Sequence, residues 1–502
     1  MASLLQELVA PNGRSIKLDT GLFINNTFVA GHAEPIKTIN PTDESVICEV
    51  QAAAESDVDA AVQAAKTAFQ DPAWRRLEPD QRGALIYRLA ELIDQHKEDL
   101  ATLEAWDNGK PYQLALTEDL EEVIGVLRYY AGWADKIHGQ TMANAGGYKL
   151  GYTLREPIGV CGQIIPWNYP LNMASWKLGP ALACGNTIVL KAAEQTPLSI
   201  LYIAKLIKQA GFPPGVVNII NGLGPIAGSS LCTHPDVHKI AFTGSTATGK
   251  TIMKLASSTL KDISLETGGK SPIIIFPDAN LDQASKWANF GLMSNQGQIC
   301  TATSRMLVHR GVLDEFLSRL CQSITETNIV GDPFDDETFQ GPQVSLDQYN
   351  RVLGFIERAK EQGAAVVLGG RPLQNKPNGR GYFIEPTVFS QVTREMELFR
   401  EEVFGPVAAV TVFDTEEEAI ELANESQYGL GASVFTENIQ TAHRVAGSLE
   451  SGQVWINSSN DAHWTMPFGG VKQSGIGREL GEKGLDAYSS VKSVHVNLSL
   501  KV

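Results

Sequence analysis

The stretch "KIAFTGSTATGKT", residues 239–251, contains the order of elements that decides the fold. The apolar run "KIAF" predicts a short buried strand, Gly244 supplies a turn, and the following residues favour a helix. A helix N-terminus directly after a strand binds phosphate, because free backbone N–H groups point out of its first turn. Residues 244–251 also fit GxxxxGK[ST], so a phosphate-loop ATPase is one alternative.

Three further strands of the same kind are predicted nearby. They are "IGVCGQII" at 158–165, "NTIVLK" at 186–191 and "GVVNII" at 215–220, and a helix is predicted in "LSILYIAKLIKQAGFPPG". Short apolar strands joined by helical crossovers predict an open parallel sheet of an α/β protein. Ligands bind such sheets at the carboxyl ends of the strands. Polar residues follow three of these strands, at Trp167-Asn168, at Lys191 to Glu194 and at Gly244-Ser245, which predicts a nucleotide crevice.

A glycine-rich segment follows the strand at 215–220. Gly222, Gly224 and Gly228 in "NGLGPIAG" imitate the dinucleotide pattern GxGxxG, although the third spacing differs and Pro225 intervenes. The pattern is therefore weak evidence for a dinucleotide turn, and Gly224 is a candidate cofactor contact.

The composition excludes several classes of protein. The chain has 502 residues, of which 43% are hydrophobic and 20% charged, as in ordinary globular proteins of several domains. A formal net charge of −16 argues against a nucleic-acid or anionic membrane partner. No apolar run of about 18 residues predicts a membrane span. Residues 1–18 contain Glu7 and few basic residues, unlike a targeting peptide.

The six cysteines are far apart and form no CxxC pair. Neither a disulfide framework nor a zinc ribbon is expected, which favours a reducing compartment such as the cytoplasm. Cys232, His234 and His238 form one CxHxxxH cluster, but Pro235 interrupts it and no second ligand group follows. We expect no metal site.

Two segments alternate apolar and polar residues with the period of a half-buried strand. They are "GYKLGYTLRE" at 147–156 and "SVHVNLSLKV" at 493–502. Together they predict a small separate sheet whose edges need covering. A second subunit is one cover, and a hairpin packed on its own subunit is the alternative.

Two other segments have a local interpretation. Residues 79–110 carry apolar residues at helical spacing and predict one helix that stops at Asn108-Gly109. Residues 264–276, "SLETGGKSPIIIF", predict a hinge followed by a strand.

Three side chains are candidates for chemistry. Cys300 lies in "NQGQICTATSR", among small and polar residues that suit a functional loop better than a core. Its thiolate would be a strong nucleophile, but a thiol with a pKa of about 8.5 is mostly protonated at neutral pH and needs a base or a positive neighbour. Glu266 precedes two glycines that leave it room to move, and Asn168 is a neutral donor between two prolines.

Seven motifs in order resemble the NAD(P)-dependent aldehyde dehydrogenase superfamily. The resemblance covers the chain from about residue 20 to 495. The motifs are "PWNYP", "LKAAEQTP", "FTGST", "LETGGKSP", "GQICTATSR", "EEVFGPV" and "PFGGVKQSGIGRELG".

The resemblance implies a role for each matched residue. Cys300 would attack the aldehyde carbon, Asn168 would hold the oxyanion with the Cys300 N–H, and Glu266 would activate the water that hydrolyses the thioester. NAD, or NADP, would be the cofactor. The implied cofactor contacts are Trp167, Lys191, Glu194, Gly224, Gly244, Ser245, Glu402 and Phe404. The implied aldehyde tunnel is lined by Tyr169, Met173, Trp176 and Trp464.

The resemblance also implies an architecture and an assembly. A Rossmann-like parallel-sheet cofactor domain would span 1–136 and 159–269, and an α/β catalytic domain 270–470. A small oligomerisation sheet would come from 137–158 and 471–502 and build a homodimer or homotetramer. The amino-aldehyde and betaine-aldehyde branch is an alternative to the general one, although Ser294 stands where that branch tends to carry an aromatic cage residue.

Overall fold

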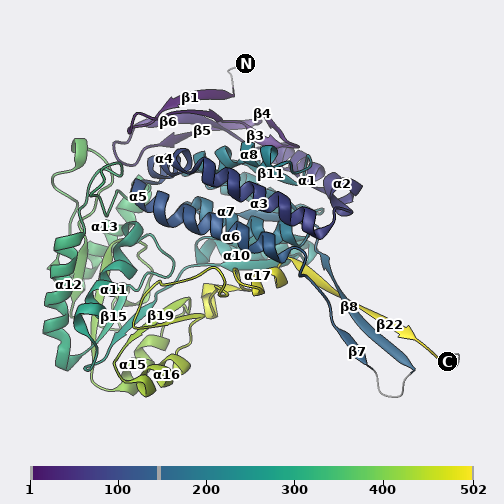
Figure 1. Ribbon diagram of the computed structural model, residues 1–502. Coiled ribbons are helices and arrows are strands. Elements are labelled where there is room, and N and C mark those ends of the chain that lie inside the picture. Colours follow the sequence, from purple (N-terminus) through teal and green to yellow (C-terminus); the bar gives the residue numbers. More distant parts are fainter. Residues whose placement is uncertain (1–3, 144–147, 500–502) are drawn as a thin grey trace.

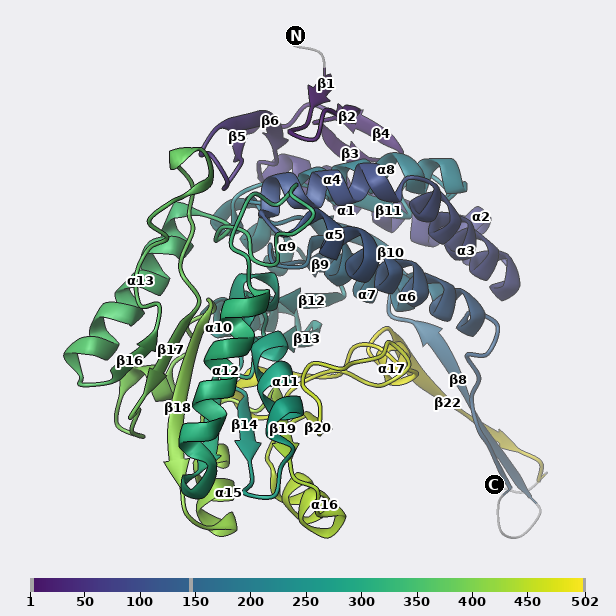
Figure 2. The same cartoon turned by 60° about the vertical axis from the view of Figure 1, so that its left-hand side comes forward.

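The computed structural model describes residues 4–143 and 148–499. Two helix-covered sheets lie next to each other, and a narrow three-stranded sheet projects away from the first (Figure 1). The chain begins the first sheet, makes two strands of the projecting sheet, and then completes the first sheet. It next builds the second sheet and returns to the first before it ends in the projecting sheet (Figure 2). The α/β fold class is confirmed.

The first sheet has eight strands in the order β21-β13-β12-β9-β10-β11-β3-β4, and its five central strands run parallel. All four apolar runs predicted as strands lie in it, and their residues are buried. The strands are β3 Leu22–Ile24, β4 Thr27–Val29, β9 Val160–Ile164, β10 Thr187–Lys191, β11 Val217–Ile220, β12 Lys239–Thr243, β13 Asp262–Glu266 and β21 Gly475–Ile476.

The order of the strands creates a crevice. The chain runs from β9 through β10 to β11, then returns to place β12 on the other side of β9. Two consecutive connections therefore leave the sheet in opposite directions next to β9. The carboxyl edge at such a switch point is where doubly wound sheets bind their ligands.

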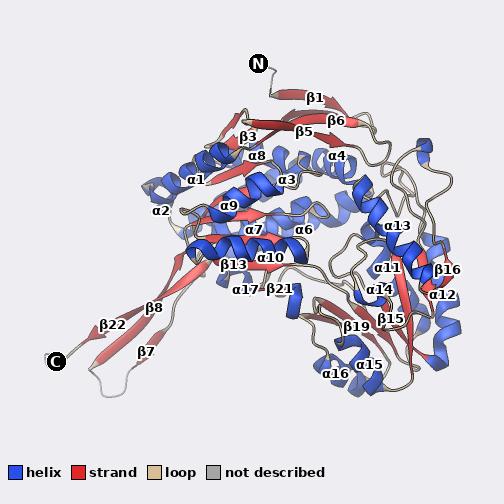
Figure 3. Ribbon diagram, turned by 180° about the vertical axis from the view of Figure 1, so that it is seen from behind, coloured by secondary structure: helices blue, strands red, loops and turns tan. Residues whose placement is uncertain are grey.

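Helices cover both faces of the first sheet (Figure 3). Alternate strand residues point to opposite faces, so Ile188 and Leu190 pack with α3, α4, α6, α7 and α8, while Val189 packs with α1, α9 and α10. The helices are α1 Glu55–Gln70, α2 Pro72–Arg75, α3 Pro79–Gln95, α4 Lys97–Asn108, α5 Tyr112–Leu114, α6 Leu120–Trp133, α7 Pro170–Ala183, α8 Leu198–Ala210, α9 Ser229–Thr233 and α10 Thr246–Ala256. Two antiparallel strand pairs flank β3 and β4 in the chain. The pair before them is β1 Leu5–Val9 with β2 Ser15–Asp19, and the pair after them is β5 Ala33–Ile39 with β6 Val46–Ala52.

The single helix predicted over 79–110 is wrong, because α3 and α4 are separate helices. His96 between them leaves the helical region at φ −111° and ψ 16°, and its ring meets the Tyr202 hydroxyl at 2.9 Å. The break lets α4 bury every residue from Leu100 to Asn108. The predicted end is confirmed: Gly109 caps α4 in the left-handed conformation, φ 85°.

The second sheet has seven strands in the order β16-β17-β18-β15-β14-β19-β20, and only β16 runs antiparallel to its neighbour among these strands. The strands are β14 Pro272–Ile275, β15 Arg305–His309, β16 Ala365–Leu368, β17 Thr387–Ser390, β18 Val407–Phe413, β19 Gly431–Phe435 and β20 Gln453–Ile456. The accompanying helices are α11 Leu281–Met293, α12 Leu313–Thr327, α13 Leu346–Glu361, α14 Glu397–Arg400, α15 Glu416–Asn424 and α16 Ile439–Ser448.

The prediction for 264–276 was incomplete. The expected hinge is preceded as well as followed by a strand, since β13 ends at Glu266 and β14 begins at Pro272. β13 is short and mostly polar in sequence, "DISLE", so its period gave little signal. Residues 267–271 therefore connect the two sheets, and Glu266 stands at the carboxyl edge of the first.

The projecting sheet is formed by β7 Thr141–Ala143, β8 Lys149–Pro157 and β22 Ser489–Asn497. The predicted pairing of the two alternating segments is found, with β22 antiparallel to β8 from Ser489–Pro157 to Asn497–Lys149. Large apolar side chains stay exposed on it, namely Met142, Tyr148, Leu150, Leu154, Val491 and Leu498. Gly147, Leu500 and Val502 of the predicted strands lie outside the described residues.

The predicted oligomerisation segment 471–502 stays a prediction, and its first part lies on the first sheet and not in the projecting one. Residues Gly475–Ile476 form β21, which pairs with β13 in the first sheet, and α17, Lys483–Asp486, packs on α7. Only the part from Ser489 on belongs to the projecting sheet, because the preceding glycine-rich turn brings the chain back across the first sheet.

Candidate active site

A cavity of about 220 Å³ lies at the carboxyl edge of the first sheet, between it and the second. All three predicted catalytic side chains, Cys300, Glu266 and Asn168, line it. Five predicted cofactor residues line it too: Trp167, Gly244, Ser245, Glu402 and Phe404. Residues as far apart in the chain as Trp167 and Phe404 thus meet where the switch point of the sheet predicts a ligand.

A second cavity of about 340 Å³ meets the first at Cys300. The two share the walls of Tyr169, Met173, Trp176 and Phe468. All four predicted tunnel residues line the second cavity, including Trp464, which stacks on His463 with ring centroids 4.2 Å apart. The thiol therefore stands at the junction of the crevice and a chamber with aromatic walls.

The Cys300 thiol is protonated at neutral pH in this arrangement. Burial, followed by the charges of Glu266 and Glu402, raises its pKa to about 12. Such a thiol reacts only if a base accepts its proton or a positive group approaches it.

Glu266 ends β13 with both carboxyl oxygens buried and without a hydrogen-bond partner among the described residues. Burial, and then the nearby Glu479, raises its pKa well above the usual value of a glutamate. Lys177 donates to Glu479 at 2.8 Å and to the Thr243 hydroxyl at 2.6 Å, which keeps a charged pair next to the carboxyl. A buried carboxyl with a raised pKa accepts and releases a proton at a higher pH than an exposed glutamate does, which suits a general base. Sequence reasoning missed Lys177 and Glu479, although the latter lies in the quoted motif "GIGRELG".

Asn168 follows β9 in the loop before α7. Its side-chain amide donates to the Gln298 carbonyl at 2.9 Å, two residues before Cys300. The loop that carries the thiol and the loop that carries the amide are therefore in direct contact.

Three predicted cofactor residues form a cluster that does not line either cavity. Glu194 accepts from the Lys191 ammonium group at 3.2 Å and from the Gly224 N–H at 3.3 Å. Lys191 ends β10, and Gly224 follows β11. The glycine pattern alone supported Gly224 poorly as a cofactor contact. In the structure, however, Gly224 lies next to Lys191 and Glu194 of "LKAAEQTP".

The other cofactor candidates surround the crevice. Ser245 caps α10 by accepting from the Thr248 N–H at 3.2 Å. Trp167 and Phe404 meet edge to face with centroids 5.3 Å apart. Glu402 accepts from the Gly269 N–H at 2.9 Å, and burial raises its pKa to about 7.

Two polar residues that sequence reasoning missed support this side of the crevice. Arg351 donates to the Glu402 carbonyl at 2.9 Å, and Gln348 donates to the Phe404 carbonyl at 2.7 Å. Both come from α13, and no quoted motif contains them. The sequence pattern could not predict these two contacts, because only the tertiary packing of α13 brings the side chains to the cavity.

The lysine of the phosphate-loop pattern lies away from the crevice. Lys250 is exposed on α10 and is not a lining residue of the first cavity. A phosphate-loop lysine has to reach the bound phosphates, so this placement argues against the ATPase alternative.

The chamber has carboxyl groups at its wall and no lysine or arginine among its described lining residues. Glu118, Asp119, Glu121 and Glu122 all line it. Glu122 accepts from the Trp176 indole N–H and the Asn172 amide, each at 2.8 Å, and burial raises its pKa to about 7. Among Glu122, Asn172 and Trp176, only Trp176 was identified from the sequence.

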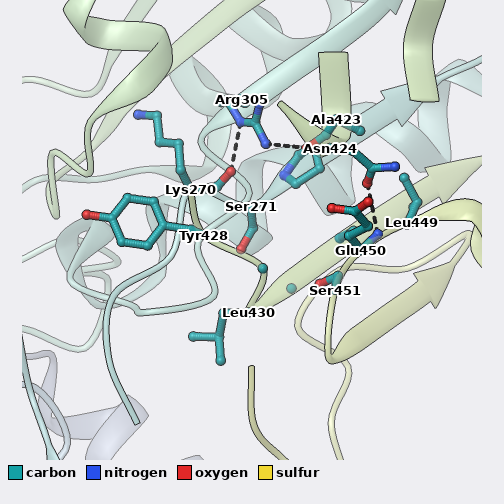
Figure 4. A pocket seen from close by; sticks show the side chains of 14 residues that line it. Lys270, Ser271, Arg305, Ala423, Asn424, Tyr428, Leu430, Leu449, Glu450 and Ser451 are labelled. Atoms are coloured by element: carbon teal, nitrogen blue, oxygen red, sulfur yellow. Dashed lines mark hydrogen bonds between the residues drawn. The ribbon is translucent and has the colours of Figure 1, made fainter. Parts of the chain in front are cut away.

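A very small cavity lies behind the connection between the two sheets (Figure 4). Arg305 is buried there and donates to the Lys270 and Ala423 carbonyls, each at 2.8 Å. The cavity volume of about 10 Å³ holds at most a water molecule. The buried Arg305 therefore anchors residues 267–271.

The described residues contain no group of three or more histidine, cysteine or acidic side chains that could hold a metal ion. In the CxHxxxH cluster, His234 contacts Asp59 and His238 accepts from the Val160 N–H. No helix in ranges 4–143 and 148–499 is long and apolar enough to cross a membrane.

A doubly wound sheet with a crevice at its switch point, next to a thiol and a carboxyl group, favours the class of dinucleotide-dependent oxidoreductases. Residues 28–494 match the aldehyde dehydrogenase family, and the chain belongs to that family.

Individual relatives agree over nearly the whole chain. The mitochondrial aldehyde dehydrogenase of Homo sapiens is 49% identical over 503 residues, covering 100% of this chain and 96% of that protein. A structure of a Bacillus cereus aldehyde dehydrogenase in complex with NAD+ is 51% identical with a TM-score of 0.93, covering 96% of this chain and 97% of that one. A Staphylococcus aureus betaine aldehyde dehydrogenase in complex with NAD+ is 38% identical with a TM-score of 0.94, covering 97% and 96%. These identities favour the general branch over the betaine-aldehyde alternative.

Proposed function

We propose that this protein oxidises an aldehyde to its carboxylic acid with NAD+, through a thioester on Cys300. The observation that carries the proposal is the position of Cys300 at the junction of the crevice and the aromatic chamber. A thiol at that point reaches an aldehyde in the chamber while a dinucleotide occupies the crevice. The family membership and the NAD+ complexes of relatives support the same assignment.

The crevice fits a dinucleotide. Gly244 and Gly268 leave the crevice walls without side chains, and the first turn of α10 offers free N–H groups to a pyrophosphate. Lys191 and Glu194 would hold the adenosine ribose, with Gly224 behind Glu194. Ser245 and Trp167 would contact the pyrophosphate, and Glu402 and Phe404 would position the nicotinamide half. When bound, NAD+ supplies the acceptor for the hydride of the aldehyde carbon.

The first covalent step is the attack of Cys300 sulfur on the aldehyde carbon. A C–S bond forms, the C=O π electrons move to oxygen, and the thiol proton leaves to a base. Because the thiol pKa is raised to about 12, deprotonation is part of the barrier. The side-chain amide of Asn168 and the Cys300 N–H would stabilise the oxyanion.

Thioester hydrolysis is the work of Glu266. After hydride departure the acyl group remains on sulfur. The Glu266 carboxylate accepts a proton from a water molecule, whose oxygen forms the new C–O bond while the C–S bond breaks. Buried, unpaired oxygens at the end of β13 and the glycines at 268 and 269 suit a base that changes position between steps.

We infer that the chamber takes neutral aldehydes with an aliphatic or aromatic body. Tyr169, Met173, Trp176 and Trp464 give apolar walls. Of the four carboxyl groups, Asp119 is paired with Lys110 and Glu121 with Lys97. The other two, Glu118 and Glu122, disfavour an aldehyde that carries a carboxylate.

We further assign the first sheet, within 1–136 and 159–269, to cofactor binding and 270–470 to the catalytic half. The projecting sheet of β7, β8 and β22 would pair with another subunit in a homodimer or homotetramer, because its apolar side chains are exposed. The widely spaced free cysteines support a reducing compartment, and we assign the cytoplasm. Fractionation of the native host tests this against the mitochondrion, where a relative resides.

The test of the function is NADH absorbance at pH 7 to 9 with a panel of aldehydes. Turnover should appear with the wild type and fall below about one per cent of it in Cys300→Ala, since loss of a covalent nucleophile costs several decades. NAD affinity should stay unchanged in this variant, because the adenosine half binds at β10 and β12. Residual turnover above that level would remove Cys300 from the role, and no turnover with any aldehyde would contradict the proposed reaction.

A further inference from the structure

The amide of Asn295 links the two loops that carry the proposed oxyanion donor and the nucleophile. Its Nδ2 lies 3.0 Å from the Asn168 carbonyl and 3.3 Å from the Gln298 carbonyl. The Asn168 side chain donates to that same Gln298 carbonyl at 2.9 Å. One NH2 group therefore connects the backbone of Asn168 to the backbone two residues before Cys300.

The side chain of Asn295 cannot easily take another orientation. The residue is fully buried, and its Oδ1 has no hydrogen-bond partner among the described residues. A flipped amide would point Oδ1 at two carbonyl oxygens, which repel it. The backbone is left-handed at φ 48° and ψ 38°, a conformation that asparagine and glycine tolerate best.

A second asparagine supports the same loop from the other side. Asn108, the last residue of α4, donates to the Trp167 carbonyl at 2.6 Å and to the Asn168 carbonyl at 3.3 Å. Asn108 fixes the Asn168 loop to the first sheet, whereas only Asn295 of the two also contacts the loop of the nucleophile.

We propose that Asn295 is a positioning residue that sets the distance between the Asn168 amide and Cys300. The inference rests on the proposed function, in which Asn168 stabilises the oxyanion. An oxyanion donor contributes about 10²- to 10³-fold to rate, and a displacement of about 1 Å costs about 10²-fold. Loss of the bridge therefore lowers aldehyde kcat/KM by about 10- to 100-fold, mainly through kcat.

The variant to measure is Asn295→Gly, which keeps the left-handed backbone and adds no charge near the thiol. Asn457→Gly is the matched control. Asn457 is also left-handed, at φ 56°, and its amide also donates to a backbone carbonyl, that of Thr436 at 3.1 Å. It is not a described lining residue of either cavity, so its variant should keep kcat/KM within about threefold.

Alkylation of Cys300 by iodoacetamide separates positioning from general damage. Alkylation forms no oxyanion, so its rate in Asn295→Gly should stay within about threefold of the wild type, as should NAD affinity. An alkylation rate that falls as much as kcat/KM would overturn the inference.

A double-mutant cycle with Asn168→Ala decides whether Asn295 acts through Asn168. In the Asn168→Ala background, Asn295→Gly should lower kcat/KM by less than about threefold, because the group it positions is gone. If Asn295→Gly lowers kcat/KM as much in the Asn168→Ala background as in the wild type, the inference is overturned. A wild-type rate in Asn295→Gly beside an impaired Asn168→Ala overturns it and leaves the proposed function intact.

Two further outcomes also decide against the inference. A wild-type rate in Asn168→Ala contradicts the proposed oxyanion role and the inference together. If Asn295→Gly does not fold, Asn295→Asp keeps the side-chain volume and removes the donor, and the same cycle applies. Failure of both variants to fold would assign the amide to folding and overturn the catalytic role.

Discussion

Glu266 shows how a single side chain is prepared by its surroundings. It ends a strand with both oxygens buried, while Lys177 pairs with Glu479 and not with Glu266. A buried carboxyl group without its own cation has a raised pKa, because burial penalises the charged form. These surroundings favour the protonated form of Glu266, and the group acts as a base only after losing a proton.

Glu266→Gln should slow acid release more than thioester formation. The amide keeps the size of the side chain but cannot accept a proton from water. We expect a pre-steady-state burst of NADH followed by slow turnover, measured by stopped-flow absorbance. Turnover equal to the wild type would show that another group activates the water.

The steady-state rate should rise as pH increases. A carboxyl group with a raised pKa is protonated below that pKa, so the base form of Glu266 is lost as pH falls. The fraction of Cys300 present as thiolate also rises with pH, because its pKa is raised to about 12. Turnover of the wild type and of Glu266→Gln against pH checks this, and a flat wild-type profile would argue against both roles.

At the scale of elements, the ends of β9, β10, β12 and β13 decide where chemistry occurs. Parallel strands place their carboxyl ends on one edge, so Trp167, Glu194, Ser245 and Glu266 all follow or end neighbouring strands. Trp167, Ser245 and Glu266 line the crevice, whereas Glu194 lies outside its lining, so the proposed role of each strand end can be tested separately.

Glu194, after β10, should favour NAD over NADP. Its carboxylate accepts from Lys191 and the Gly224 N–H and would repel a 2′-phosphate on the adenosine ribose. We expect Glu194→Gln to lower the ratio of kcat/KM with NAD to kcat/KM with NADP by about tenfold. A tenfold change corresponds to about 1.4 kcal/mol, which we assign to the lost charge repulsion. A wild-type kcat/KM with NADP equal to or above that with NAD would contradict this.

Lys250 in α10 should be dispensable, although the phosphate-loop pattern contains it. The side chain is exposed, and an isolated surface charge contributes about 0.5 kcal/mol. Lys250→Ala should keep NAD affinity and aldehyde turnover within about threefold, measured by titration and initial rates. Magnesium-dependent ATP hydrolysis by the wild type that this variant loses would revive the ATPase alternative.

At the scale of the whole molecule, the projecting sheet of β7, β8 and β22 leaves large apolar side chains exposed. β22 pairs with β8 along nine residues, yet Leu154, Val491 and Leu498 remain exposed. A sheet this narrow is marginal in water unless its apolar side chains are buried by another surface.

Deletion of residues 493–502 should break the assembly. The change removes most of β22 and leaves β8 with an unpaired edge and an uncovered apolar face. Light scattering should report a smaller particle than the wild type. An unchanged mass would support the alternative, in which the sheet packs on its own subunit.

The sequence by itself determined the parallel sheet, its four central apolar strands and the motifs that contain Cys300, Glu266 and Asn168. Apolar runs and glycine turns act within a few residues, so they can be read locally. For the same reason the end of α4 at Gly109 was predictable. The pairing of β8 with β22 followed from the matching periods of two distant segments.

Only the tertiary structure decided how these local pieces meet. It divided residues 79–110 at His96, placed Gly224 against Glu194 and brought Arg351 to the crevice from α13. It also left the Glu266 oxygens unpaired and bridged two loops with Asn295. Burial and hydrogen bonding between residues far apart in the chain depend on how complete layers pack, and no periodicity within one segment contains that information.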